Sequence, residues 1–278
     1  MTVRSALAAG AARLAAAGVP DPARDARRLM AAALGVAADR LTLRSGEPLA
    51  PEAAAAFARM LAERARFRPV AQIVGRRSFW GRDFTVSAAV LDPRPETETL
   101  VELALRGGPA ARVLDIGTGS GAILLTLLAE WPSAHGAGTD VDPAALAVAG
   151  TNADRLGVAA RLRLMRTDWV EGVDGRFDLV VSNPPYIAAA EIDALAPDVR
   201  AWEPRHALTP GPTGLESYAC IAPSLPRLLA PGGRVLLEIG PTQGQAVARL
   251  LADAGLAAIA CHPDLDGRDR VVSAAAAG

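Results

Sequence analysis

The stretch Val113-Leu-Asp-Ile-Gly117-Thr-Gly-Ser-Gly121 decides the fold. It reads as a buried strand, a glycine turn and the start of a helix that continues over residues 122–130. Glycines let the backbone turn tightly and let a ligand approach the amide groups. A glycine turn alone is also compatible with an ordinary strand-to-helix corner. The rest of the chain must therefore decide between the two interpretations.

Strands and helices alternate on both sides of this turn. Short apolar strands separated by helices predict a parallel sheet that is covered on both faces. The last two strands are expected to be antiparallel if the turn at residues 264–268 is short. The predicted strands are residues 112–116, 134–140, 161–165, 178–182, 234–239, 257–261 and 270–273.

The chain before residue 93 has a different pattern. Residues 1–68 show only helical periodicity and predict a small helical domain, whereas residues 69–92 predict a β-hairpin linker. Residues 93–278 form the predicted α/β domain. Arg64, Arg66 and Arg68 close the last N-terminal helix, where cations suit the helix dipole. They indicate either a solvated helix end or a patch that binds a partner.

Composition excludes several kinds of function. The 278 residues are 51% hydrophobic, and 29 basic residues nearly balance 30 acidic ones. This balance argues against binding to nucleic acid through a large basic face. All basic residues are arginine, so Schiff-base and Walker-type lysine chemistry is excluded. Cys220 and Cys261 predict neither a disulfide framework nor a metal site. With no apolar stretch long enough to span a membrane, we expect a soluble cytoplasmic protein.

The residues around the glycine turn indicate the ligand. Its GxGxG spacing disfavours a dinucleotide pyrophosphate. Asp140 ends the next strand, where a carboxylate can accept both hydroxyls of a ribose. Asp168 and Trp169 follow the third strand and can contact an adenine amine and the face of its ring. A nucleoside without pyrophosphate fits these groups, which predicts S-adenosylmethionine as the cofactor.

The segment Asn183-Pro-Pro-Tyr186 follows the fourth strand. Ligands of open parallel sheets bind beyond the carboxyl ends of the strands, which places this segment beside the glycine turn. An amide or aryl amine nitrogen is a poor nucleophile, but its N–H groups are donors. The Asn183 oxygen and a prolyl carbonyl, preferably that of Pro184, can accept both of them. Tyr186 can pack against the flat target group.

Together, these features resemble the bacterial peptide chain release factor glutamine methyltransferases, the HemK/PrmC family. The resemblance covers essentially the full chain. Its motifs are Ser78-Phe79-Trp80, Pro93-Arg94-Pro95-Glu96-Thr97-Glu98, Asp115-Ile-Gly-Thr-Gly-Ser-Gly121, Asn183-Pro-Pro-Tyr-Ile187, Glu203-Pro204 with Ala207-Leu208, Gly214-Leu215 with Tyr218, Glu238-Ile239-Gly240 with Gln243-Gly244, and Asp266-Gly267 with Asp269-Arg270. Asp92 departs from the apolar residue expected before Pro93.

The resemblance implies a seven-stranded Rossmann-like class I methyltransferase domain with an N-terminal helical bundle that recognises the substrate. It implies N5-methylation of the glutamine in the Gly-Gly-Gln motif of class I release factors, with S-adenosylhomocysteine as product. Asn183, Pro184, Pro185 and Tyr186 would bind the glutamine and act in catalysis, and Pro93–Glu98 would lie near the methionine end of the cofactor. The implied cofactor-binding residues are Gly117, Thr118, Gly119, Ser120, Gly121, Asp140, Trp169 and Asn183.

Three alternatives remain open. Motifs similar to Asn183–Tyr186 occur in nucleic-acid amino-methyltransferases, although the neutral charge balance and the absence of an evident target-recognition insert argue against direct nucleic-acid binding. Enzymes that methylate a glutamine of a large-subunit ribosomal protein carry a close motif set. A catalytically silent nucleotide-binding or scaffold protein is the third alternative, against which the intact Asn183 and glycine turn argue.

Overall fold

The computed structural model describes residues 1–277, which divide into two compact units. Unit 1 comprises Met1–Arg76 and Ala196–Trp202. Unit 2 comprises Arg77–Leu195 and the chain from Glu203 onward. One short segment of unit 1 is therefore inserted in the sequence of unit 2. The predicted domain boundaries after residues 68 and 92 stay predictions, and Gly278 lies outside the described residues.

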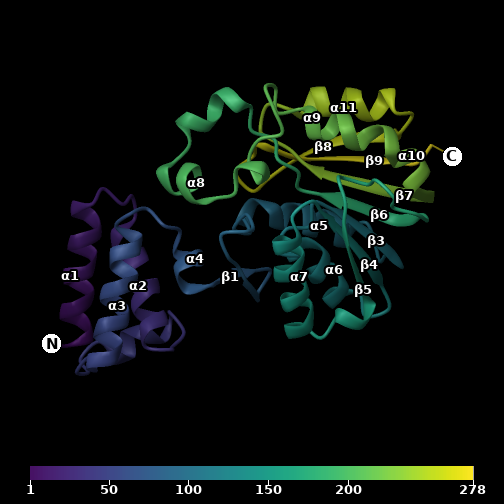
Figure 1. Ribbon diagram of the computed structural model, residues 1–278. Coiled ribbons are helices and arrows are strands. Elements are labelled where there is room, and N and C mark those ends of the chain that lie inside the picture. The colour runs from purple at the N-terminus through teal and green to yellow at the C-terminus, as the bar shows by residue number, and fades with distance from the viewer. Residues whose placement is uncertain (278) are drawn as a thin grey trace. The chain divides into compact units, whose positions relative to one another are not determined.

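Unit 1 is a helical bundle whose first helices pack side by side (Figure 1). Gly10 of the first helix lies against Phe57 of the third, where a Cβ atom would come within 2.7 Å of the ring. The glycine therefore permits close packing of these two helices. The helices of unit 1 are α1 (Val3–Ala16), α2 (Pro22–Ala33), the 3-10 helix η1 (Arg40–Arg44), α3 (Pro51–Arg64), α4 (Val70–Val74) and α8 (Pro197–Trp202).

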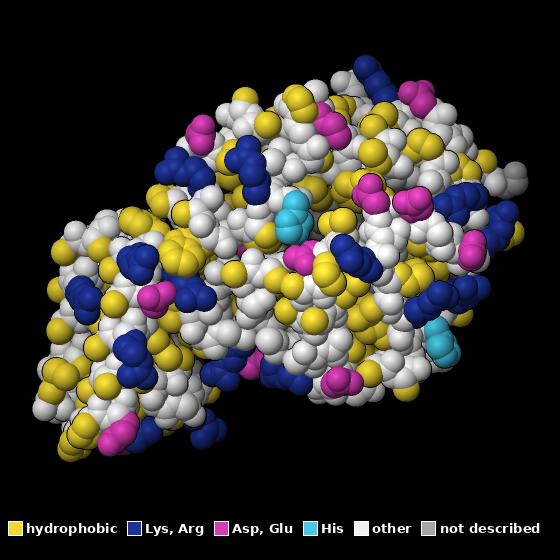
Figure 2. All heavy atoms as spheres, viewed as in Figure 1, with side chains coloured by type: hydrophobic (Ala, Val, Ile, Leu, Met, Phe, Trp, Pro, Cys, Tyr) yellow, Lys and Arg dark blue, Asp and Glu magenta, His cyan; other side chains and the backbone are white. Residues whose placement is uncertain are grey.

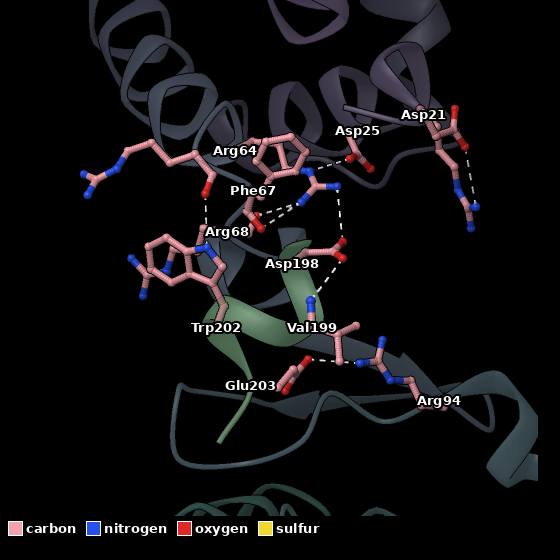
Figure 3. A network of polar contacts seen from close by, with 12 residues as sticks. Asp21, Asp25, Arg64, Phe67, Arg68, Arg94, Asp198, Val199, Trp202 and Glu203 are labelled. Atoms are coloured by element: carbon pink, nitrogen blue, oxygen red, sulfur yellow. Dashed lines mark hydrogen bonds and ion pairs between the residues drawn. The ribbon is translucent and has the colours of Figure 1, made fainter. Parts of the chain in front are cut away.

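Arg64 is buried inside unit 1, with 5% of its surface exposed. Its guanidinium pairs with Asp25 of α2 at 2.6 Å and with Asp198 of α8 at 3.5 Å (Figure 3). It also donates to the carbonyls of Phe67 and Arg68. The interpretation of this helix end as solvated is therefore wrong for Arg64, because its partners come from distant parts of the chain.

Trp202 holds α8 on the same unit. Its Nε1 donates to the Arg66 carbonyl at 3.1 Å, and the Arg68 guanidinium lies 5.5 Å from the centre of its ring. Gln72 Nε2 donates to the Trp202 carbonyl at 3.1 Å. These contacts explain why a segment from the second half of the chain belongs to the N-terminal helical unit.

Unit 2 is built on a seven-stranded sheet in the order β5-β4-β3-β6-β7-β9-β8. The first five strands in this order are parallel, and β9 runs antiparallel to both β7 and β8. This confirms the predicted fold class. The strands are β3 (Arg112–Ile116), β4 (His135–Asp140), β5 (Leu162–Arg166), β6 (Phe177–Ser182), β7 (Leu229–Glu238), β8 (Ala257–Pro263) and β9 (Asp269–Ala275).

Side chains of successive strand residues enter two different cores. Val113 packs with α5 (Glu98–Arg106), α6 (Ala122–Glu130) and α7 (Pro143–Arg155), whereas Leu114 packs with α9 (Glu216–Ile221), α10 (Leu225–Leu228) and α11 (Gly244–Asp253). Alternation along a strand thus buries both faces of the sheet. The 3-10 helices of this unit are η2 (Pro95–Thr97), η3 (Ala159–Arg161), η4 (Ala189–Ala194), η5 (Arg205–Ala207) and η6 (Ala222–Ser224).

The hairpin of β1 (Arg76–Phe79) and β2 (Arg82–Thr85) contributes to the core of unit 2. Phe79 and Phe84 pack edge to face, with ring centres 6.0 Å apart. The Asn152 amide of α7 bonds both backbone groups of Thr85, at 2.7 and 3.0 Å. The hairpin is thereby fixed on the α/β unit.

The order of the strands places a crevice at β3. The chain passes from β3 to β4 on one side, and β6 lies on the other side. Loops at the carboxyl ends of β3 and β6 diverge at such a reversal, which is where doubly wound proteins bind ligands.

Candidate functional site

The glycine turn joins β3 to α6 through three glycines in the left-handed backbone conformation. Gly117, Gly119 and Gly121 have φ angles of 71°, 55° and 80°. These values lie in the left-handed region that glycine tolerates best. Cβ atoms built on Gly117 and Gly119 would meet nothing within 4 Å, since both face open space. The turn therefore exposes its backbone to a ligand.

This turn borders a cavity of about 300 Å³ at the carboxyl ends of the central strands. Its wall contains most of the residues that the sequence singles out for cofactor binding, but Thr118, Ser120 and Gly121 do not line it. Pro184 and Tyr186 also lie outside the wall. The lining residues are Ala89, Leu91, Gly117, Gly119, Thr139, Asp140, Val141, Ala145, Thr167, Asp168, Trp169, Asn183, Pro185, His206, Ala207, Thr209, Pro210, Glu216, Ser217 and Cys220.

Asp140 ends β4 and is half-buried at the cavity. Its carboxylate accepts the backbone N–H groups of Gly119 and Asp142, each at 2.9 Å. The first bond ties the glycine turn to the neighbouring strand. Asp140 therefore supports the turn as well as facing the cavity.

Trp169 lies in the loop after β5 with a φ angle of 48°, which is unusual for a bulky residue. Its side chain is half-buried and lines the cavity beside the exposed Asp168. A large aromatic ring held in a strained backbone conformation is typical of functional sites. The position suits an aromatic ligand.

The segment Asn183–Tyr186 is held by hydrogen bonds to its backbone. Ser217 Oγ donates to the Pro185 carbonyl at 2.8 Å, and Gln243 Nε2 donates to the Tyr186 carbonyl at 2.9 Å. Among residues 1–277, no hydrogen bond reaches the Pro184 carbonyl. The carbonyls of Pro185 and Tyr186 thus already accept a hydrogen bond, whereas that of Pro184 is open to a further donor.

The Asn183 side chain is fixed on one side only. Its Nδ2 donates to Thr97 Oγ1 at 3.2 Å, and no protein donor to its Oδ1 is found among the described residues. Asn183 is half-buried and lines the cavity with Gly117. The structure thus brings Asn183 and the glycine turn together, although they are distant in sequence.

Two buried carboxyl groups lie close to this region. Burial raises the pKa of Asp115 to about 7, opposed by a hydrogen bond from Thr118 and aided by the charge of nearby Asp140. Burial likewise raises the pKa of Glu238 to about 7, although a Thr97 hydrogen bond and Arg270 lower it. Both groups therefore change charge near neutral pH.

Tyr186 is an unsuitable proton acceptor or donor at neutral pH. Burial, aided by the Glu238 charge, raises the pKa of its hydroxyl to about 12. The side chain packs with the hydrophobic core of unit 2. Its chemistry is therefore that of a rigid aromatic surface.

The segment around Asp92 is tied together by charge. Asp92 is buried, and its carboxylate lies 3.7 Å from the Arg77 guanidinium. Its backbone N–H donates to Glu203 Oε2 at 3.3 Å. Arg94 pairs with the same Glu203 carboxylate at 3.1 Å. These partners accommodate an acidic residue at the position where the family resemblance leads us to expect an apolar one.

The sequence predicts no hydrogen-bonding role for Thr97, Ser217 or Gln243, although Thr97 belongs to the segment Pro93–Glu98 that we expect near the cofactor. Each supports the Asn183–Tyr186 segment through one of the hydrogen bonds above. Thr97 and Gln243 lie within quoted family motifs, and Ser217 lies next to one. That proximity was a signal, but the partner of each side chain is visible only in the folded structure.

The doubly wound sheet, with a glycine turn at its crevice, defines a class I methyltransferase. A methyltransferase structure from Pyrococcus furiosus has the same fold, with a TM-score of 0.54 at 19% identity, over 78% of this chain and 96% of that one. Residues 5–75 match the family described as PrmC N-terminal domain, and residues 87–202 match the Methyltransferase small domain.

Two full-length relatives give the family. The Cereibacter sphaeroides protein named Release factor glutamine methyltransferase is 59% identical over 274 residues, covering 99% of this chain and 98% of the relative. A Rhodospirillum rubrum protein of the same name is 45% identical, over 95% of this chain and 82% of its own length. The chain belongs to the release factor glutamine methyltransferase family, and it is an enzyme of the methyltransferase class.

Within residues 1–277, no helix is both long enough and apolar enough to cross a membrane. The same residues contain no group of three or more histidine, cysteine or acidic side chains that could hold a metal ion.

Proposed function

We propose that the enzyme transfers a methyl group from S-adenosylmethionine to the side-chain amide nitrogen of the glutamine in the Gly-Gly-Gln motif of class I release factors. The observation that carries this proposal is the open acceptor Asn183 Oδ1, on a residue that lines the cavity with the glycine turn. The Pro184 carbonyl, which follows it in the chain, offers a second open acceptor. The names of the full-length relatives support a release factor as the protein substrate.

The cavity fits the cofactor in size and in chemistry. Gly117 and Gly119 leave room where any side chain would intrude. The half-buried Asp140 carboxylate suits the hydroxyls of a ribose, and the Trp169 ring suits the face of an adenine. When bound, S-adenosylmethionine supplies an electrophilic methyl group on sulfur.

The target amide would be oriented by the segment Asn183–Tyr186. A primary amide nitrogen offers two N–H donors. Accepting one at Asn183 Oδ1 and the other at the Pro184 carbonyl holds the planar nitrogen with its face toward the methyl donor. The same acceptors favour the positive charge that develops on nitrogen. Tyr186 packs against the flat amide.

In the reaction, the bond from nitrogen to the methyl carbon forms as the bond from carbon to sulfur breaks. The methylated nitrogen then releases one proton to water, and S-adenosylhomocysteine leaves. Positioning by Asn183 and Pro184 supplies most of the protein's contribution. A general base is not required before the transfer.

The two other substrate classes are less well supported. Acidic side chains are interspersed with arginines on the face shown in Figure 2, where the described residues form no continuous basic surface. A duplex nucleic acid needs such a surface to offset its phosphate charge. Glutamine methylation of a ribosomal protein would use the same chemistry, and the methyl-transfer test distinguishes it from release factor methylation by offering ribosomes separately.

The test measures transfer of a radiolabelled methyl group from S-adenosylmethionine. Unmodified release factor, a Gly-Gly-Gln to Gly-Gly-Ala variant, ribosomes and duplex DNA are offered separately. We expect label on the release factor alone and its loss in the variant. The Asn183→Ala enzyme serves as the matched catalytic control, with turnover lowered by roughly a hundredfold or more. Label on ribosomes or DNA instead would overturn the proposed substrate.

A further inference from the structure

Thr97 is a buried hydroxyl beside the segment that follows β6. It ends η2, and only 4% of its surface is exposed. Its Oγ1 lies 3.2 Å from Asn183 Nδ2. An amide nitrogen can only donate, so the Thr97 oxygen is the acceptor in this contact.

Glu238 is a second buried group beside the Thr97 hydroxyl. It ends β7 with 1% of its surface exposed, and the Thr97 hydroxyl is near enough to lower the pKa of its carboxyl group. Its Oε2 atom has no hydrogen-bond partner among the described residues. When this carboxyl group is ionised, it can only accept a hydrogen bond and draws the Thr97 hydrogen toward itself. Burial raises the pKa of the group to about 7, although Arg270 and Arg94 lower it, so the ionised form predominates above about pH 7.

With Glu238 ionised, the donors therefore run in one direction, from Asn183 to Thr97 and from Thr97 toward Glu238. Rotating the Asn183 amide by half a turn would set its oxygen against the Thr97 oxygen, whose hydrogen already points elsewhere. That arrangement loses a hydrogen bond and brings two oxygen atoms together. The observed orientation leaves Oδ1 on the other side of the amide, free of Thr97.

We infer that Thr97 is a positioning residue that fixes the Asn183 amide so that its oxygen accepts a substrate N–H, with the nearby Glu238 carboxylate drawing the Thr97 hydrogen away from Asn183. This inference rests on the proposed function. Without the Thr97 hydroxyl, the Asn183 amide can turn its NH₂ group toward the substrate amide, where two donors would face each other. Binding of cofactor would change less than turnover, because most of its implied contacts lie at the glycine turn, Asp140 and Trp169 rather than at Asn183.

The test compares three substitutions. Thr97→Val keeps the shape of the side chain and removes the hydroxyl, whereas Thr97→Ser keeps the hydroxyl. Thr126→Val is the matched control, because Thr126 in α6 is fully buried and its hydroxyl has no hydrogen-bond partner among the described residues. Thermal melts establish that each variant is folded. If Thr97→Val does not fold, Thr97→Ala replaces it.

Three measurements are made on each variant: steady-state kinetics, cofactor titration and NMR. With release factor as substrate, we expect Thr97→Val to lower kcat by about tenfold to a hundredfold, with KM and the cofactor Kd changed less than about threefold. Thr97→Ser and Thr126→Val should stay near the wild type. Independently of activity, the NMR signals of the Asn183 side-chain NH₂ group should move in Thr97→Val and stay in place in the two other variants.

A wild-type kcat in Thr97→Val would overturn the inference. So would an unmoved Asn183 NH₂ signal in that variant, or failure of Thr97→Ser to restore kcat. If the wild-type enzyme does not methylate release factor at all, the proposed function fails. The NMR comparison then still decides whether Thr97 orients Asn183, because it needs no substrate.

Discussion

Arg64 of α3 and Asp198 of α8 form an ion pair at 3.5 Å, although 134 residues separate them in sequence. Asp198 belongs to the segment Ala196–Trp202, which leaves unit 2 shortly after Asn183–Tyr186 and packs within unit 1. The chain belongs to unit 2 again from Glu203 onward, and residues that follow, among them His206 and Thr209, line the cavity. A single loop thus joins the helical unit to the wall of the candidate active site.

Removal of the Asp25 carboxylate should strongly destabilise unit 1. Asp25→Ala leaves the buried Arg64 guanidinium without its 2.6 Å partner, and breaking a buried pair in this way costs roughly 3 kcal/mol or more. Denaturant unfolding followed by circular dichroism measures the loss. Asp21→Ala is the matched control, because its pair with Arg24 is exposed and weak, worth less than about 1 kcal/mol. Equal effects of the two substitutions would contradict the role of Arg64.

Trp202 should control local opening of the inserted segment. Trp202→Ala removes the hydrogen bond to the Arg66 carbonyl and the stacking of Arg68, which together stabilise the closed form by about 1–2 kcal/mol. We therefore expect trypsin to cut after the exposed Arg200 on the order of tenfold faster than in the wild type. Trp202→Phe keeps an aromatic ring and should give an intermediate rate. An unchanged rate in Trp202→Ala would mean that other contacts hold α8.

The buried Glu238 should make stability fall as pH rises. Its pKa is about 7 in the folded protein against an ordinary value of 4.5. Between these values the folded protein holds a proton that the unfolded chain has released, so raising the pH favours unfolding. Glu238→Gln removes this effect.

The quantity to measure is the free energy of unfolding of Glu238→Gln minus that of the wild type, from pH 5 to pH 8. We expect the difference to grow with pH, to level off above about pH 7 and to change by at most roughly 3 kcal/mol. Asp115 is common to both proteins, so its own titration near pH 7 largely cancels. A difference independent of pH would show that Glu238 keeps an ordinary pKa.

Gly119 should be required for cofactor affinity. A methyl group there would project into the cavity, where S-adenosylmethionine is proposed to bind, from a backbone with a φ angle of 55°. We expect Gly119→Ala to weaken binding of S-adenosylmethionine by about tenfold or more in calorimetric titration. Gly157→Ala is the matched control, because Gly157 has a comparable φ angle of 69° but lies in a turn outside the cavity. Both variants should lose about 1–2 kcal/mol of stability, but only the first should lose affinity.

Much of unit 2 could be predicted because its signals are local. The alternation of apolar strands and helices predicts a covered parallel sheet, and the observed strands follow the predicted ones within a few residues, except that β7 begins earlier, at Leu229. The glycine turn and Asn183-Pro-Pro-Tyr186 are short continuous motifs, so each could be placed at a strand end. Their meeting at one cavity followed from the topology of doubly wound sheets.

The hydrogen-bond partners could not be predicted in the same way. Arg64 has the sequence setting of a solvated helix end, and only Asp25 and Asp198, both distant in the chain, make it a buried cation. The family resemblance places Thr97 only within a segment near the cofactor, whereas the structure bonds its side chain to Asn183 across 86 residues. No local pattern identifies such pairs.

The sequence by itself determined the class of fold, the cofactor-type turn and the identity of the candidate acceptor, because these depend on residue type, periodicity and short spacing. The tertiary structure decided which way the Asn183 amide faces, which carbonyl stays open and which unit holds residues 196–202. Hydrogen-bond direction depends on the donors and acceptors that folding brings into contact, and those come from segments far apart in the chain.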